Sequence, residues 1–188
     1  MKALVTALLL SALVSAYIVG APEPHCSTCH TPANPVKFEV KGLPKYYVPG
    51  KEYNVTIAIT EKCEGKCCEG FYFSIPAGDV KVSDPKAMKV ERPPFGTPYL
   101  THTEEGRFRT SWSFKWIAPK ERIPLTFTVS VLKANCDNEP TGDNFSIKEI
   151  KVYPEGYVPP KSSNRLPYLI IGVASIAIAT LLLILAIA

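Results

Sequence analysis

The sequence lacks the patterns that identify a helical protein or an enzyme acting through its side chains alone. Outside the two chain ends, no segment keeps a 3.6-residue apolar repeat over 11 residues, which argues against a helical bundle or a βαβ fold. There is no Ser-His-Asp arrangement, no pair of carboxylates in a helical or loop context, and no phosphate-binding glycine loop. We therefore expect that the chain is not an enzyme.

A strong excess of charge of either sign is also absent. The chain has 21 Lys and Arg against 17 Asp and Glu, and removal of Lys2 with an N-terminal leader leaves a formal net charge of +3. The basic residues are scattered along the chain. Because a nucleic-acid-binding face needs a concentrated basic patch, we expect no nucleic-acid partner.

Histidine is scarce, with three in the chain, and one of them completes the most informative motif. Residues Cys26-Ser27-Thr28-Cys29-His30 match Cys-x-x-Cys-His, the pattern that attaches a c-type haem. Both thiols then form thioethers with the haem vinyl groups, and the adjacent imidazole becomes an axial ligand of the iron. The motif predicts one covalent haem c per chain, with Cys26 and Cys29 binding the cofactor and His30 binding the metal.

Three other interpretations of the motif were weighed. A zinc site would need a second pair of ligands at matching spacing, and the chain has no further Cys-x-x-Cys or His-x-His pair. A thioredoxin-like site would precede a helix, which Pro32 and Pro35 disfavour. A structural disulfide between Cys26 and Cys29, with an incidental histidine, stays open as the plainer alternative.

A second iron ligand has three candidates: His25, Met88 and His102. His25 lies on the same tethered segment as His30, so it could reach the opposite haem face only through an awkward loop. Met88 would give His/Met ligation and a high potential. His102 follows the proline-rich loop 93–98, and a loop histidine at a sandwich end could fold over the haem. We prefer His102 over Met88, with an open site third and an uninvolved loop histidine as the plain alternative.

The chain ends suggest export and anchoring. Residues 1–20 place Lys2 before an apolar run and small residues, the order of a signal peptide, although an uncleaved anchor is the alternative. Residues 166–188 are 23 residues without a charge, about 34 Å as a helix, which suffices to cross a bilayer. The proline-rich stretch 154–165 is expected to form a stalk before this anchor. The predicted location is the cell membrane, with the domain outside the cytoplasm.

Between a haem-attachment segment at 21–36 and the stalk, residues 37–153 show period-2 alternation. The strands we expect are short and antiparallel, and the fold class is an all-β immunoglobulin-like sandwich. The aromatic run Trp112, Phe114 and Trp116 is assigned to the core rather than to haem contact. Near Glu149 the alternation slips by one residue, which predicts a bulge.

Four further cysteines, Cys63, Cys67, Cys68 and Cys136, form an even set that favours disulfides in an exported chain. A bond between the neighbours Cys67 and Cys68 would be strained. We expect Cys63 to pair with one of them and Cys136 with the other, and the connectivity stays open. A second metal site made from these thiols is the alternative.

Several short motifs occur in an order that resembles a known family. They are Tyr47-Val48-Pro49-Gly50, Gly70-Phe71, Thr101-His102-Thr103, 112–119 and Thr141-Gly142-Asp143-Asn144. Their order resembles the reelin N-terminal (reeler) domains, and more closely the exported microbial relatives called choice-of-anchor V domains. The resemblance covers about residues 25–153 and implies an immunoglobulin-like sandwich at a cell surface. It also draws attention to His102, because a Thr-His-Thr element recurs in relatives with the haem motif. The insert from Cys63 to Cys68, and Cys136, depart from the family pattern.

These features support three hypotheses about function. The first is a membrane-anchored monohaem cytochrome c that transfers electrons to a membrane-bound or surface redox protein through transient docking. The second is a surface adhesion or assembly module of reeler type in which Cys26 and Cys29 form a structural disulfide. The third is a small haem enzyme or ligand sensor with an open iron site. Six-coordinate iron would favour the first over the third.

Overall fold

Alternating apolar and polar residues give each long strand of this protein one buried face. The computed structural model describes residues 20–22, 24, 26, 30, 34–62, 67–137, 139 and 141–159. In that part of the chain the regular structure is strands and 3-10 helix, the latter at η3 (Glu105–Phe108) and at Cys26, without an α-helix. The strands are β1 (Phe38–Lys41), β2 (Tyr46–Tyr47), β3 (Glu52–Ile59), β4 (Cys68–Ser74), β5 (Asp79–Val82), β6 (Met88–Glu91), β7 (Tyr99–His102), β8 (Ser111–Ile117), β9 (Leu125–Ala134) and β10 (Asn144–Pro154).

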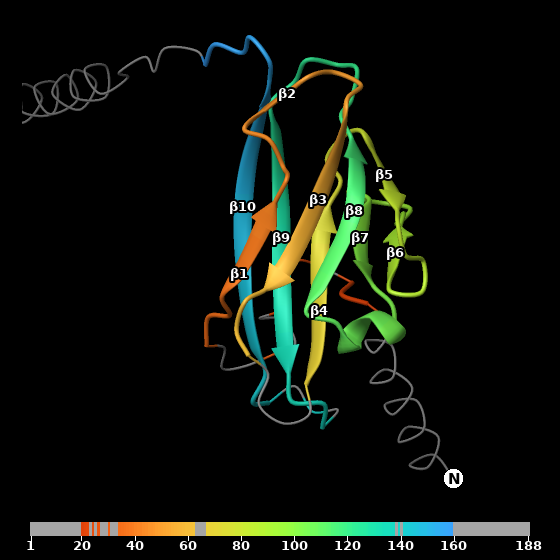
Figure 1. Ribbon diagram of the computed structural model, residues 1–188, viewed down its shortest axis with the longest axis vertical. Coiled ribbons are helices and arrows are strands. Elements are labelled where there is room, and N and C mark those ends of the chain that lie inside the picture. The colour runs from red at the N-terminus through yellow and green to blue at the C-terminus, as the bar shows by residue number, and fades with distance from the viewer. Residues whose placement is uncertain are drawn as a thin grey trace, which may run out of the picture. The chain divides into compact units, whose positions relative to one another are not determined.

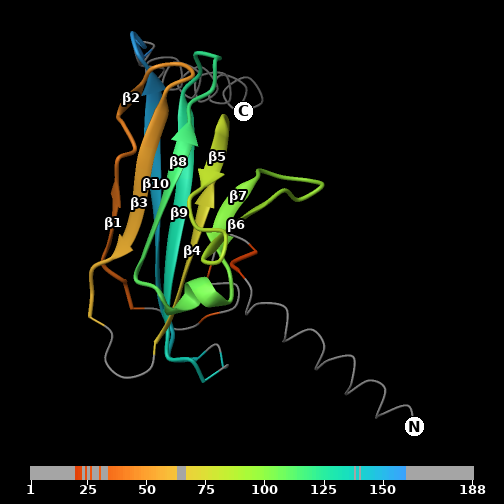
Figure 2. The ribbon, with the colours of Figure 1, turned by 45° about the vertical axis from the view of Figure 1, so that its right-hand side comes forward.

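The strands form two sheets that pack face to face, as the sequence predicted (Figure 1). One sheet has the order β1-β3-β8-β5, and the other has the order β2-β10-β9-β4-β7-β6. Neighbouring strands are antiparallel except β2, which pairs in parallel with the end of β10. Figure 2 shows the second sheet extending past the first through the hairpin of β6 and β7. The all-β prediction is therefore confirmed.

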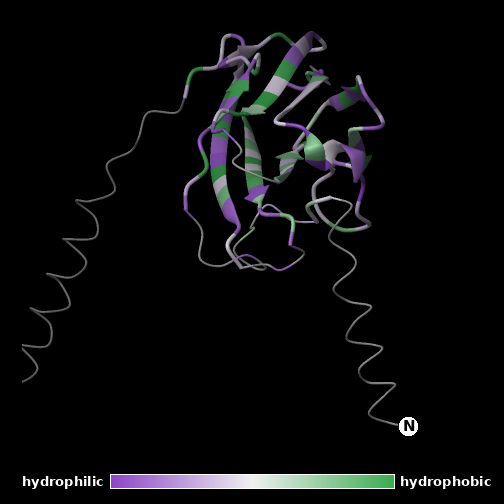
Figure 3. Ribbon diagram, turned by 60° about the horizontal axis from the view of Figure 1, so that its bottom comes forward, coloured by the Kyte–Doolittle hydropathy of each residue, from purple (hydrophilic) through white to green (hydrophobic). Residues whose placement is uncertain are grey.

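The core lies between the two sheets and is rich in aromatic rings. Along β8 the burial pattern alternates strictly, so that Trp112, Phe114 and Trp116 all point inward and are almost completely buried. Phe73 on the other sheet lies 4.9 Å from Phe114, measured between ring centroids. The same alternation is visible as bands of colour along the strands in Figure 3. These aromatic residues are therefore packing residues, as expected.

The bulge expected near Glu149 is not formed. β10 pairs with β9 in one uninterrupted antiparallel register, from Asn144 opposite Lys133 to Val152 opposite Leu125. The alternation of apolar and polar residues slips because one face of β10 is apolar at its start and the other face is apolar at its end. Ile150 and Val152 share the core-facing side, whereas Phe145 and Ile147 lie on the outer face of the sheet.

The predicted chain-end segments fall largely outside this description. Residues 1–19 and 160–188 lie outside the described residues, and with them most of the predicted signal peptide and the whole predicted anchor. Pro154, placed in the stalk by the sequence, is the last residue of β10. Within the residues that the structure describes, no helix has the length and apolar character needed to cross a membrane.

Candidate functional site

The segment that carries the haem motif is attached to the six-stranded sheet at two separate strands. Near its start it contacts β7, and near its end it contacts β10. Strands β9 and β4 lie between these two attachments in the sheet. In each case a backbone N–H donates to a side-chain oxygen: Ala21 to Thr101 Oγ1 at 2.9 Å, Asn34 to Asn144 Oδ1 at 3.0 Å, and Val36 to Ser146 Oγ at 2.8 Å. The described residues on either side of the motif are therefore held against the sheet.

Within the motif, the first cysteine and the histidine are one turn apart. The His30 backbone N–H donates to the Cys26 carbonyl oxygen over 2.8 Å, an i to i−4 bond of the kind that closes a helical turn. This bond places Cys26 and His30 one turn apart on the same short stretch of chain. Cys29 and His25 lie outside the described residues.

The His30 ring faces a buried carboxylate. His30 Nδ1 lies 2.8 Å from Asp143 Oδ2, and the two side chains are 22% and 3% exposed. Asp143 stands in the loop between β9 and β10, and its other oxygen, Oδ1, accepts the Asn135 backbone N–H over 3.1 Å. This is a close contact without hydrogen-bond geometry, and Nδ1 has no hydrogen-bond partner among the described residues. A neutral imidazole carries one N–H, so a proton on Nδ1 would leave the Nε2 lone pair for another partner.

The sequence suggested that His102 lies on a loop, and this was wrong. His102 is the last residue of strand β7 and is 7% exposed. Its Nδ1 lies 3.3 Å from the Phe71 backbone nitrogen and accepts that N–H. The regular pairing of β4 with β7 ends at Tyr72 and Thr101, one residue before. The imidazole therefore takes the place of a backbone acceptor where the two strands separate.

Burial controls the charge of His102. Desolvation, assisted by the positive charges of Lys89 and Arg107, lowers the pKa of its imidazole from 6.5 to about 4. The ring is neutral at physiological pH, and because Nδ1 accepts a hydrogen bond, the proton lies on Nε2. Ligation of iron through Nε2 would require His102 to give up the Phe71 bond. Its role as second ligand stays a prediction.

The structure does not bring His102 next to His30. His30 lies against the β9–β10 loop, whereas His102 lies between β4 and β7. The other candidate, Met88, pairs with His102 across β6 and β7, and its side chain is 2% exposed within the core. Met88 is thus a packing residue in this conformation, and its ligand role also stays a prediction.

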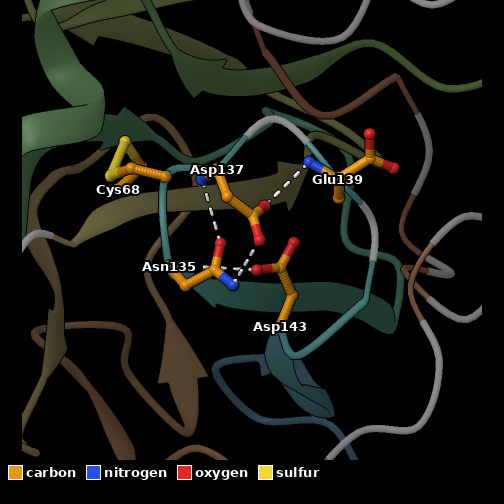
Figure 4. Close-up of a disulfide and its surroundings, with 6 residues drawn as sticks. Cys68, Asn135, Asp137, Glu139 and Asp143 are labelled. Carbon is orange, nitrogen blue, oxygen red and sulfur yellow. Dashed lines mark hydrogen bonds between the residues drawn. A yellow bond between two sulfur atoms is a disulfide. The ribbon is translucent and has the colours of Figure 1, made fainter.

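A disulfide lies close to the His30–Asp143 contact. Cys68 at the start of β4 is bonded to Cys136 in the β9–β10 loop, with 5.3 Å between their Cα atoms. This bond confirms the expectation that Cys136 pairs with one of the two adjacent cysteines. Cys67 is disulfide-bonded as well, and Cys63 lies outside the described residues. Figure 4 shows the disulfide beside the hydrogen-bonded loop that contains Asp143.

The outer face of the six-stranded sheet is apolar near this loop. Leu132 on β9 lies opposite Phe145 on β10, and Ile147 lies next along the same face. Ile147 is 38% exposed, and Leu132 and Phe145 are half-buried. These three side chains form a small apolar strip on the solvent side of the sheet.

Two buried acidic residues near the site were not anticipated. Asp143 belongs to the Thr141–Asn144 motif, but nothing in the sequence connects it to His30. Glu69 is 3% exposed, and among the described residues neither oxygen of its carboxylate has a hydrogen-bond partner. Desolvation raises the pKa of Glu69, and Lys133 opposite it on β9 partly counteracts this. The sequence held one indication, because Glu69 shares the alternation of Phe71 and Phe73.

Across the residues that the structure describes, no three His, Cys, Asp or Glu side chains form a group able to hold a metal ion by themselves. Cys26 Sγ lies 4.0 Å from the Pro24 carbonyl oxygen. The part of the site that can be described is therefore one histidine with a carboxylate behind it, beside one of the two motif cysteines.

Comparisons with known proteins give structural neighbours only. No protein-family model matches the chain, and no curated protein matches it. The Reelin-N domain of F-spondin is 17% identical over 69% of this chain and 95% of that one, with a TM-score of 0.47. The human F-spondin reeler domain is 17% identical over 65% and 91%, with a TM-score of 0.42. The major pilin SpaD from Corynebacterium diphtheriae is 15% identical over 63% and 35%, with a TM-score of 0.39. The neighbours include reeler domains, and likenesses of this size bear on neither cofactor nor activity.

Proposed function

We propose that this chain is a monohaem c-type cytochrome, anchored at the cell membrane with its domain outside the cytoplasm, that transfers electrons to a membrane-bound or surface redox protein. The observation that supports it best is the 2.8 Å contact between His30 Nδ1 and Asp143 Oδ2. Histidine ligands of metals commonly donate their second ring N–H to a carboxylate or carbonyl oxygen. His30 has a carboxylate beside its ring nitrogen Nδ1, in a close contact that lacks the geometry of a hydrogen bond, and it follows Cys26 at the spacing that haem attachment needs.

The residues present fit a covalent haem. Cys26 and Cys29 would hold its edge by thioether bonds, and His30 would offer Nε2 to the iron. The apolar outer face at Leu132, Phe145 and Ile147 provides the kind of surface that a porphyrin ring covers. When bound, haem c supplies a centre that gains and loses one electron.

The protein's own residues would then bind, orient and shield this group. The hydrogen bonds from Ala21, Asn34 and Val36 hold the tethered segment against the sheet. One side of the haem would stay near the surface, because the His30 side chain is 22% exposed. A partner can approach that side through a small, transient interface of the type found between redox proteins.

The decisive experiment is a haem stain on a denaturing gel, with the full chain produced in a host that attaches haem c. The wild-type chain should stain, and Cys26→Ala with Cys29→Ala should not stain. The matched control is Cys68→Ala with Cys136→Ala, which removes the disulfide between β4 and the β9–β10 loop and should still stain per unit of chain. An unstained wild-type chain would exclude the proposal.

The second iron ligand needs its own measurement on the haem-loaded chain. His102→Ala should shift the Soret band and the midpoint potential if the imidazole binds iron. Met88→Leu serves as the comparison, because it removes the other candidate and keeps a core side chain of similar volume. An unchanged spectrum for His102→Ala would show that His102 does not bind iron and serves only to accept the Phe71 N–H.

A surface adhesion or assembly module is the second candidate. The Cys68–Cys136 disulfide favours it, because a disulfide-stabilised sandwich needs no cofactor to act at a cell surface. In this case Cys26 and Cys29 would be joined to each other. The intact mass of the mature chain separates the candidates. For an adhesion module, the mass would not include haem and would be two hydrogens lower for each disulfide.

A further inference from the structure

Both oxygens of Asp143 have a polar neighbour, and the contact with Asn135 has the geometry of a hydrogen bond. Oδ1 accepts the Asn135 backbone N–H, and Oδ2 lies 2.8 Å from His30 Nδ1. The residue is 2% exposed, although it stands in a loop. A carboxylate that is removed from water in this way has a fixed position and a fixed orientation, so it can define where the facing ring lies.

The loop that holds Asp143 is itself held. Asn135, which donates to Asp143, directly precedes Cys136, and the Cys68–Cys136 disulfide connects this point to β4. The Asn135 side-chain amide donates to Asp137 Oδ2 over 2.8 Å, and the Asp137 N–H donates back to Asn135 Oδ1 over 3.0 Å. Figure 4 shows these bonds around Asn135. The position of Asp143 thus depends on covalent and hydrogen-bonded connections that do not involve His30.

We propose that Asp143 is the positioning residue for the iron ligand: it accepts the Nδ1–H of His30 and so fixes the tautomer and the direction of the ring. This inference rests on the proposed function, because it assigns a role within the haem site. The carboxylate also makes the imidazole a stronger electron donor to the metal. A stronger donor stabilises ferric over ferrous iron, so Asp143 lowers the midpoint potential of the haem.

Two substitutions at Asp143 separate its charge from its geometry. Asp143→Asn keeps an oxygen acceptor but removes the charge, and it should raise the midpoint potential with covalent haem unchanged. Asp143→Ala removes the acceptor too, and it should also broaden or shift the Soret band, because the ring is no longer oriented. The matched control is Asp79→Asn on β5, in the other sheet, whose exposed carboxylate pairs with Arg92. This control should keep the wild-type potential.

A second measurement needs no haem. In the full chain with Cys26→Ala and Cys29→Ala, nitrogen NMR of the His30 ring should show the proton on Nδ1, and adding Asp143→Ala should move it mainly to Nε2. A haem-loaded Asp143→Asn chain with the wild-type potential would overturn the role of Asp143 alone. If the proton of the His30 ring stays on the same nitrogen when Asp143→Ala is added, the role of Asp143 is also overturned. Absence of covalent haem from the wild-type chain would overturn the proposed function, and this role with it.

Discussion

Gly70 and His102 lie so close that a side chain on Gly70 would collide with the imidazole. A Cβ atom built at position 70 would stand 2.5 Å from His102 Cε1 and 3.0 Å from His102 Nδ1. Gly70 thus leaves room for the ring that accepts the Phe71 N–H between the separating strands β4 and β7. The glycine of the Gly70-Phe71 motif has a steric function in this fold.

Replacing Gly70 with alanine should destabilise the folded chain by about 1–3 kcal/mol, because the ring or the strand must move. Urea unfolding of the haem-free chain measures this loss. The double variant Gly70→Ala with His102→Ala provides the control, since the smaller side chain at 102 restores the space. The double variant should lose less stability than the sum of the two single variants. Strict additivity would show that the collision is relieved elsewhere.

The buried ring of His102 should make the stability of the haem-free chain depend on pH. Its pKa is lowered from 6.5 to about 4 by burial, so between these values the unfolded chain binds a proton that the folded chain does not. The free energy of unfolding is therefore greatest above pH 6.5 and falls as the pH falls towards 4, by up to about 3 kcal/mol. Urea titrations at pH 7.5 and 4.5 measure the difference. In His102→Gln this part of the dependence should disappear.

The strands were predictable because their side chains repeat with a period of two. The run Leu125, Phe127, Val129 and Val131 is fully buried on one side of β9, as expected for a sheet packed on a core. The phase change in β10 was misinterpreted as a bulge because alternation alone does not say which face is covered. Phe145 and Ile147 on the outer face explain the phase change without any break in register.

The candidate site was only half predictable. Cys26, Cys29 and His30 form a local motif, and their spacing is visible in the chain. The partner of His30 is 113 residues away and is brought near by the pairing of β9 with β10, which no local pattern encodes. His102 was expected on a loop because it follows the prolines, yet strand pairing with Met88 buries it.

Glu69 should cost the protein stability at neutral pH. Desolvation raises the pKa of its carboxyl group, so the folded chain binds a proton at pH values where the unfolded chain has released it. The free energy of unfolding therefore decreases as the pH rises from about 4.5 through the folded-state pKa of Glu69. Glu69→Gln should be more stable than wild type at pH 7, by about 1 kcal/mol, and equal to it at pH 4. Glu149→Gln, an exposed carboxylate on β10, should change neither value.

The Cys68–Cys136 disulfide should contribute substantially to stability. The two cysteines are 68 residues apart in sequence, and a cross-link of that span removes about 4 kcal/mol of chain entropy from the unfolded state. Cys68→Ser with Cys136→Ser should lower the free energy of unfolding by about this amount, measured by urea unfolding without reductant. A further change should appear at the site, because Cys136 adjoins Asn135, the donor to Asp143. In the haem-loaded chain the double variant should therefore move the midpoint potential in the same direction as Asp143→Asn. A stable double variant with an unchanged potential would show that the β9–β10 loop holds Asp143 without the cross-link.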